Sequence, residues 1–211
     1  RLMQEGCTYT QAEYPFTRPD RASATACFHS GAVPYDNGIP SEQGLDRRSL
    51  RPLFCVDDKN FEGIHTDEYS SPVHLSVSTI GDELKIATEG KGMVISISPF
   101  RDAAILSAGH AADACFWIND QTGQWCSTTY YGKFPFWAQT YNRHKSLQER
   151  IKNITWVPSN AIVGNFSYLV SGEIKSPFSH KFKGERAFRE FKFSGMINEE
   201  VNRFATQCIT A

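Results

Sequence analysis

One β-rich stretch in the middle of the sequence constrains the fold most. Residues 93–98, MVISIS, are a short apolar run with β-branched side chains that ends at Pro99. Such a run is typical of a buried strand. Residues 114–118 and 125–131 predict two further strands, which form a hairpin because Gly123 between them is free to adopt a positive φ. The stretch therefore predicts an α/β protein.

Two amphipathic helices are predicted to pack on this sheet. The first spans residues 78–89 and ends before Gly90, with apolar side chains at helical spacing, namely Val77, Ile80, Leu84 and Ala87. The second spans residues 197–209, where Ser194 or Asn198 is the candidate N-cap. Its apolar face carries Ile197, Val201, Phe204, Ala205, Cys208 and Ile209.

A site is expected at the end of the first predicted strand. In open α/β sheets, ligands bind beyond the carboxyl ends of the strands. Phe100, Arg101 and Asp102 follow that end directly. These three residues therefore lie where chemistry is expected in such a fold.

Four short motifs resemble one enzyme superfamily. They are SGAVP at 30–34, NGI at 37–39, STIGDEL at 78–84 and AGHAA at 108–112, followed by the aromatic hairpin. Together they resemble the alkaline phosphatase superfamily, in its type I phosphodiesterase/nucleotide pyrophosphatase branch and the related bacterial phosphatases. The resemblance is specific over roughly residues 1–142 and looser to residue 211.

The resemblance implies a three-layer α/β/α core, incomplete in this chain, with a small aromatic-rich β cap. We expect residues 1–145 to be the N-terminal part of the α/β domain, residues 146–193 the cap, and residues 194–211 a helix that returns to the core. The cap is marked by aromatic side chains that form either a platform for a nucleobase or lipid group or, more commonly, a core. They include Trp156, Phe166, Phe178, Phe182, Phe188, Phe191 and Phe193.

Family members attack phosphorus with a Thr or Ser and pass through a phosphoenzyme. The resemblance places this nucleophile at a helix N-terminus, where free N–H groups hold the phosphoryl oxygens, ten positions before Gly31. That position is Arg21. Ser23 and Thr25 are the nearby hydroxyls and hence the catalytic candidates. The alternative is that both are ordinary residues of a helix start capped by Asp20.

Two further phosphate-handling positions of the family also depart from the pattern. The Asn that binds a phosphoryl oxygen corresponds to Glu42, whose charge would repel phosphate. The Lys-x-Arg clamp of the monoesterases corresponds to Phe100 and Asp102, with Arg101 between them. Arg21 and Arg101 are therefore the candidate substrate-binding residues, and a diester or pyrophosphate is a more suitable substrate than a monoester.

Intact family members usually hold two zinc ions, and the resemblance implies that their Asp and His ligands lie upstream and downstream of this chain. The six histidines show no grouping with metal-ligand spacing. We therefore expect no metal ligands and no cofactor within these 211 residues.

Composition excludes several partners. The net charge of −1 and pI near 6.7 give no electrostatic basis for binding a nucleic acid polymer. No apolar run reaches the roughly 20 residues of a membrane span. The six cysteines contain no CxxC spacing, and Cys115 and Cys126 are diagonal neighbours across the predicted hairpin. Free, mostly buried thiols are expected.

The sequence therefore predicts a fragment or degenerate member of a metal-dependent phosphodiesterase/nucleotide pyrophosphatase-like hydrolase, inactive as this chain. The alternative is a non-catalytic ligand-binding or interaction protein on the same scaffold. A small-molecule phosphate ester is the expected ligand, and exposed sheet edges are a route to self-association. The resemblance alone implies a bacterial source and a periplasmic or secreted location.

Overall fold

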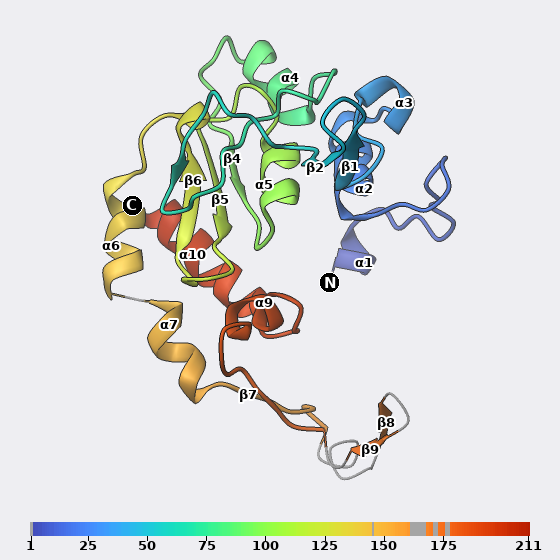
Figure 1. Ribbon diagram of the computed structural model, residues 1–211. Helices are drawn as coiled ribbons and strands as arrows, with labels where there is room; N and C mark the ends of the chain where they lie inside the picture. Colours follow the sequence, from blue (N-terminus) through green and yellow to red (C-terminus); the bar gives the residue numbers. More distant parts are fainter. Residues whose placement is uncertain (1, 145, 161–167, 171–172, 176–177) are drawn as a thin grey trace.

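The centre of the molecule is a mixed four-stranded sheet in the order β3-β6-β5-β4 (Figure 1). The computed structural model describes residues 2–144, 146–160, 168–170, 173–175 and 178–211, and of residues 2, 168–170 and 173–175 only the backbone. The strands are β3 (Gly63–Ile64), β4 (Ile95–Ile97), β5 (Ala114–Ile118) and β6 (Trp125–Thr128).

The three predicted strands are present as β4, β5 and β6. β4 and β5 run parallel, with Ile95 opposite Ala114, and β5 and β6 form the expected antiparallel hairpin, with Trp117 opposite Cys126. The parallel pair is joined through α5 (Arg101–Ala108), because parallel neighbours need a crossover connection. After β6 the chain forms a 3₁₀ turn, η1 (Thr129–Tyr131), so the strand is shorter than predicted.

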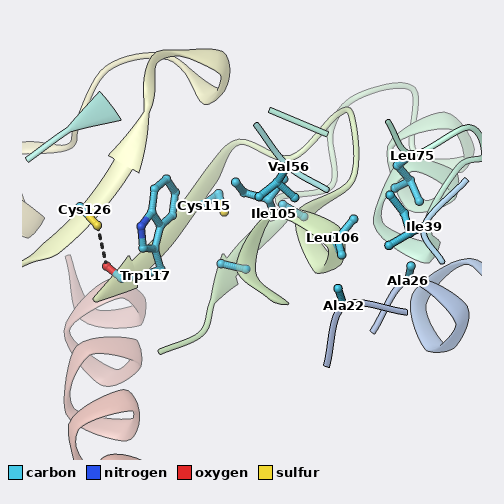
Figure 2. Packing of buried hydrophobic residues seen from close by; sticks show 12 residues of the cluster. Ala22, Ala26, Ile39, Val56, Leu75, Ile105, Leu106, Cys115, Trp117 and Cys126 are labelled. Atoms are coloured by element: carbon cyan, nitrogen blue, oxygen red, sulfur yellow. Dashed lines mark hydrogen bonds between the residues drawn. The ribbon is translucent and has the colours of Figure 1, made fainter. Parts of the chain in front are cut away.

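Successive residues of β5 point to opposite faces of the sheet and anchor two separate cores. Cys115 and Trp117 lie in one apolar cluster, and Phe116 and Ile118 lie in the other. Figure 2 shows the first cluster, in which the Cys126 thiol lies 3.3 Å from the Trp117 carbonyl oxygen across the hairpin. The sheet is therefore buried on both sides, as expected for the middle layer of three.

Helices form the two outer layers. On one side, α2 (Arg21–Ser30) and α5 pack together, beside the short α3 (Pro34–Asn37) and α4 (Ile80–Ala87) (Figure 1). On the other side lie α6 (Phe136–His144) and α10 (Ile197–Thr210), whose Phe204 stacks on Trp125 with ring centroids 4.1 Å apart. The predicted α/β class and the helix that covers the sheet are both confirmed.

The predicted packing of α4 is wrong. Ile80 and Leu84, expected to face the sheet, are 72% and 45% exposed, whereas Gly81 and Asp82 are buried. The Asp82 carboxylate is drawn inward because it accepts hydrogen bonds from the backbone N–H groups of His110 and Ala111 at 2.8 and 2.7 Å. Polar hydrogen bonding therefore sets the rotation of this helix in place of its apolar stripe.

Other local predictions need smaller corrections. α10 begins after Met196 without a side-chain cap, so neither Ser194 nor Asn198 is its N-cap. All six cysteines are free, as expected, but only Cys115 and Cys126 are buried. A further hairpin, formed by β1 (Gln43–Asp46) and β2 (Arg51–Phe54), lies outside the main sheet.

The aromatic-rich region consists of short elements. They are α7 (Leu147–Arg150), η2 (Ile151–Asn153), β7 (Thr155–Trp156), β8 (Tyr168–Val170), β9 (Glu173–Lys175), β10 (His180–Lys181) and α9 (Ala187–Lys192). Phe182 and Phe191 are buried in the second core, so part of the aromatic content fills a core. Phe193 is 65% exposed, and Phe166 lies outside the described residues.

Near the N-terminus lies one further short helix, α1 (Leu2–Glu5).

Candidate functional site

The N-terminus of α2 is closed by a capping box. The Asp20 carboxylate accepts the Ser23 N–H at 2.8 Å, and the Ser23 hydroxyl accepts the Asp20 N–H at 3.0 Å. The Ser23 hydroxyl also donates to Asp20 Oδ1 at 2.8 Å, and its side chain is fully buried. Thr25 is half-buried one turn into the helix. The helix start predicted with Asp20 as its cap is confirmed, and the Ser23 hydroxyl is hydrogen-bonded within this cap.

Arg21 lies at the first turn of α2 and bridges two acidic side chains. Its Nε is 2.8 and 2.9 Å from the two carboxylate oxygens of Asp102. Its Nη2 donates to Glu42 Oε1 at 2.7 Å. Asp102 lies in the first turn of α5 and its side chain is 6% exposed, whereas the Glu42 side chain is 42% exposed. Three positions expected to handle phosphate are therefore joined to one another by ion pairs.

The environment of Arg21 favours its charged form. Burial opposes the charge, but the hydrogen bond and the negative charge of Asp102, followed by those of Glu42, outweigh burial and raise the pKa of Arg21. The guanidinium also lies 4.1 Å from the centre of the Phe100 ring, a cation–π contact. Arg21 is therefore a fixed cation with its planar fork already occupied by carboxylates.

Arg101 occupies a similar environment one helical position earlier than Asp102. Its Nη1 lies 3.0 Å from Asp57 Oδ1 and donates to the Ser70 hydroxyl at 3.2 Å, and its Nε lies 3.5 Å from Glu68. The guanidinium is 5.3 Å from the centre of the Phe54 ring. Both predicted substrate-binding arginines therefore lie at one site, and both are ion-paired within the chain.

A cavity of about 430 Å³ opens beside these residues. Among its lining side chains four are basic and five are acidic; they are Arg21, Arg101, Arg189 and Lys192, with Glu42, Asp67, Glu68, Asp102 and Asp120. Lys192 pairs with Asp120 and donates to the Ile118 carbonyl at 3.0 Å. The cavity is thus close to electrically balanced, and most of its positive charge is neutralised internally.

Several residues of the cavity were not predicted as site residues. Arg189, Lys192 and Phe193 come from α9 and the residue that follows it, about ninety residues after Arg101. The Lys192 Nζ lies 5.0 Å from the centre of the Phe100 ring, and the centre of the Phe193 ring lies 5.1 Å from it. Phe193 was marked only as one of the cap aromatics, and nothing in the local sequence pattern marks Arg189 or Lys192, because only the folded chain brings α9 to the end of β4.

The described residues do not fit the zinc pair that the resemblance implies. Among them, no three His, Cys, Asp or Glu side chains lie together as metal ligands. The carboxylates nearest the phosphate-handling positions, Asp102 and Glu42, are held by Arg21. No metal-dependent step is therefore assigned to these residues.

The fold is a three-layer α/β/α scaffold with a charged cavity at the end of β4. No family model matches the sequence. The alkaline phosphatase PhoV of Synechococcus elongatus is 32% identical over 194 residues, and the alkaline phosphatase PafA of Elizabethkingia meningoseptica is 27% identical over 158 residues. These matches cover 88% and 72% of this chain, which spans about a third of the length of these relatives, 34% and 29%.

The crystal structure of PafA superposes with a TM-score of 0.71, at 24% sequence identity, over 90% of this chain and 39% of PafA. This superposition shows the shared fold, and by its sequence likeness to PhoV the chain belongs to the alkaline phosphatase superfamily.

A second solved structure of PafA is informative about the positions described above. It is a variant substituted at a threonine, an asparagine, and a lysine and an arginine two positions apart, and it matches this chain at 25% identity with a TM-score of 0.71. These are the four residue types that the resemblance places at Arg21, Glu42, Phe100 and Asp102. The threonine and asparagine of PafA are also separated by as many positions as Arg21 and Glu42.

Proposed function

We propose that this chain is a degenerate member, or part of one, of the alkaline phosphatase superfamily, and that its phosphoryl site no longer supports turnover. The observation that carries the proposal is that Arg21, which the resemblance places at the nucleophile position, bridges Asp102 and Glu42. A guanidinium stays protonated in proteins and has no free lone pair with which to attack phosphorus. The position can therefore not form a phosphoenzyme.

Phosphate binding at the same place is opposed by charge. A phosphate ester that approached Arg21 would have to displace Asp102 from a two-oxygen contact and would face Glu42. Leaving the 6% exposed Asp102 side chain without its cation costs free energy, because a buried charge has lost its partner. Arg21 therefore serves as a structural cation at this position.

Hydrolysis by the purified protein tests the proposal. We expect no turnover of p-nitrophenyl phosphate or bis-p-nitrophenyl phosphate above the buffer rate, with or without added zinc. Turnover that is lost in Ser23→Ala or Thr25→Ala would refute the proposal and assign the nucleophile to that hydroxyl. Turnover that both variants retain would refute it as well and indicate another nucleophile. If turnover were found, a diester or a pyrophosphate would be the first kind of substrate to test.

A reversion variant provides a test that does not depend on turnover. Arg21→Thr, Glu42→Asn, Phe100→Lys and Asp102→Arg together recreate the residue types of the family. We expect inorganic phosphate to raise the unfolding temperature of this variant, because two cations and an amide donor then face the anion. The unmodified protein should show no such shift, and a matching shift in both proteins would contradict the assignment of these positions.

A non-catalytic binding role is the second candidate. It is favoured by the cavity itself, which stays open at about 430 Å³ and is rimmed by Phe54, Phe100 and Phe193. Such a volume lies in the usual range of small-molecule sites, roughly 300–1,000 Å³. Retention of a formed cavity without a nucleophile is the pattern expected of a binding protein on an enzyme scaffold.

Family likeness suggests a location for the protein, and the geometry of the sheet suggests a route to assembly. No helix in the described part of the chain is long and apolar enough to cross a bilayer. A periplasmic or secreted location follows from the resemblance alone and is tested by cell fractionation. β4 has a strand partner on only one side within the described residues, so self-association through this edge is tested by light scattering across protein concentrations.

A further inference from the structure

A second cavity, of about 490 Å³, lies between the β7–β10 pair and α9, next to the cavity around Arg21. The two cavities share Arg189 and Phe193 as lining residues. The second cavity is lined by Trp156, His180, Lys181, Phe182, Arg186, Arg189, Glu190 and Phe193. None of these residues is among the phosphate-handling positions described above.

The charge of this second cavity differs from that of the first. Lys181, Arg186 and Arg189 are basic, and Glu190 is the one acidic side chain among the described lining residues. The three basic side chains are exposed and make no ion pair within the described part of the chain. Their positive charge is therefore available to an external anion, in contrast to that of Arg21 and Arg101.

Aromatic side chains accompany these cations. Trp156 is half-buried and packs edge-on against Phe178 with ring centroids 5.0 Å apart, which fixes the indole. Phe193 contacts Phe100 and is nevertheless 65% exposed, and Phe182 is buried at 6%. A large exposed aromatic ring beside a cavity offers a planar group a surface on which to stack.

We propose that this second cavity binds a phosphorylated compound that carries a planar ring. The phosphate is held by Arg186 and Arg189, and the ring lies against Trp156 and Phe193. Arginine suits this role because its planar fork donates two parallel hydrogen bonds to phosphate oxygens. The proposal goes beyond the function proposed above and does not depend on whether the cavity around Arg21 has lost turnover.

Isothermal titration calorimetry with two probes tests the proposal, with adenosine 5′-monophosphate and phenyl phosphate as ligands. Adenosine and inorganic phosphate are the controls for the ring and for the anion. We expect saturable binding of both probes, weaker binding of both controls, and loss of affinity as salt is raised. Absence of saturable binding by either probe, or equal binding of inorganic phosphate, would overturn the proposal.

Variants then locate the site. Arg186→Gln and Arg189→Gln should each weaken probe binding by about tenfold or more, as expected for loss of a charge-assisted hydrogen bond. Lys183→Gln is the matched control, because Lys183 is exposed on the same loop and does not line the cavity, and it should leave affinity unchanged. Phe193→Leu should reduce the preference for a ring-bearing probe.

Two outcomes separate this proposal from the preceding one. Equal effects of Lys183→Gln and Arg186→Gln would indicate only non-specific attraction and would refute the site. Chromatography of the probes after titration reports whether the phosphate ester is cleaved. Cleavage would contradict the proposed loss of turnover, whereas the effect of Arg186→Gln on affinity would still decide the site, because Arg186 lines only the second cavity.

Discussion

Substitution of Arg21 by Met should destabilise the protein by about 2–4 kcal/mol. Methionine keeps much of the length of the side chain but removes the charge. Asp102, 6% exposed, then loses hydrogen bonds to both carboxylate oxygens, and a hydrogen bond to a charged group contributes about 1.5–3 kcal/mol. Glu42, 42% exposed, adds at most about 1 kcal/mol, because water screens an exposed pair.

A double-mutant cycle separates the ion pair from other effects. Asp102→Leu removes the buried carboxylate, so the variant with both substitutions no longer carries an uncompensated charge. We expect it to be more stable than the sum of the single effects predicts, by about 1.5–3 kcal/mol. Guanidinium chloride unfolding, followed by circular dichroism, measures all four proteins, and similar m-values are required for the comparison.

Arg203→Met is the control for the loss of an arginine as such. Arg203 pairs with Glu199 on the surface of α10, with side chains 52% and 59% exposed. Such a pair contributes about 0.5 kcal/mol or less. If Arg21→Met changed stability no more than Arg203→Met, or if the cycle were additive within about 0.5 kcal/mol, the bridging role of Arg21 would be refuted.

Three further changes have expected outcomes. Asp20→Ala should cost about 1–2 kcal/mol in the free energy of unfolding, because the cap of α2 is lost. Burial opposes the charge of Asp20, but hydrogen bonds from the Ser23 and Glu42 N–H groups outweigh it and lower the pKa below 3.8. The stability that ionised Asp20 contributes should therefore be present above pH 3.8 and disappear as pH falls through the lowered pKa. Unfolding curves of the unmodified protein and of Asp20→Ala between pH 2.5 and 6 would check this. A difference in stability that stayed constant over this range would contradict it. Gly109→Ala should cost about 1–3 kcal/mol, since φ is +67° and a Cβ would lie 2.3 Å from Thr79 Oγ1; an unchanged melting temperature would exclude this. Burial raises the pKa of the Cys55 thiol to about 12. At pH 8 this thiol should therefore react with Ellman's reagent far more slowly than the exposed Cys7. The variants Cys55→Ser and Cys7→Ser identify which thiol gives which rate, and equal rates for the two thiols would be inconsistent with this.

The sequence predicted those helices and strands in which the residues that the local pattern expects to be buried are the ones buried in the structure. The hairpin of β5 and β6 and the helix α2 with its Asp20 cap follow from turn residues and capping chemistry. The same pattern reading failed for α4, because hydrogen bonds from residues 110 and 111 to Asp82 override its apolar spacing. A contact formed 28 residues away cannot be read from the periodicity of one helix.

The candidate site was predictable only where it coincides with family motifs. Arg21, Glu42, Phe100 and Asp102 depart from the pattern at known positions, so their importance could be anticipated. Their mutual pairing could not, because 81 residues separate Arg21 from Asp102. The second cavity was hidden for a similar reason, since its cations become a cluster only when α9 folds against the β7–β10 pair.

The bridge formed by Arg21 also bears on how such a site evolves. If Arg21 alone returned to threonine, Asp102 would remain buried without a cation, and if Asp102 alone became arginine, two guanidinium groups would face each other. Both of these single steps towards the family pattern therefore pass through a less stable protein. Under the proposed function, this mutual dependence of Arg21 and Asp102 would make the loss of a phosphoryl site difficult to reverse by one mutation at a time.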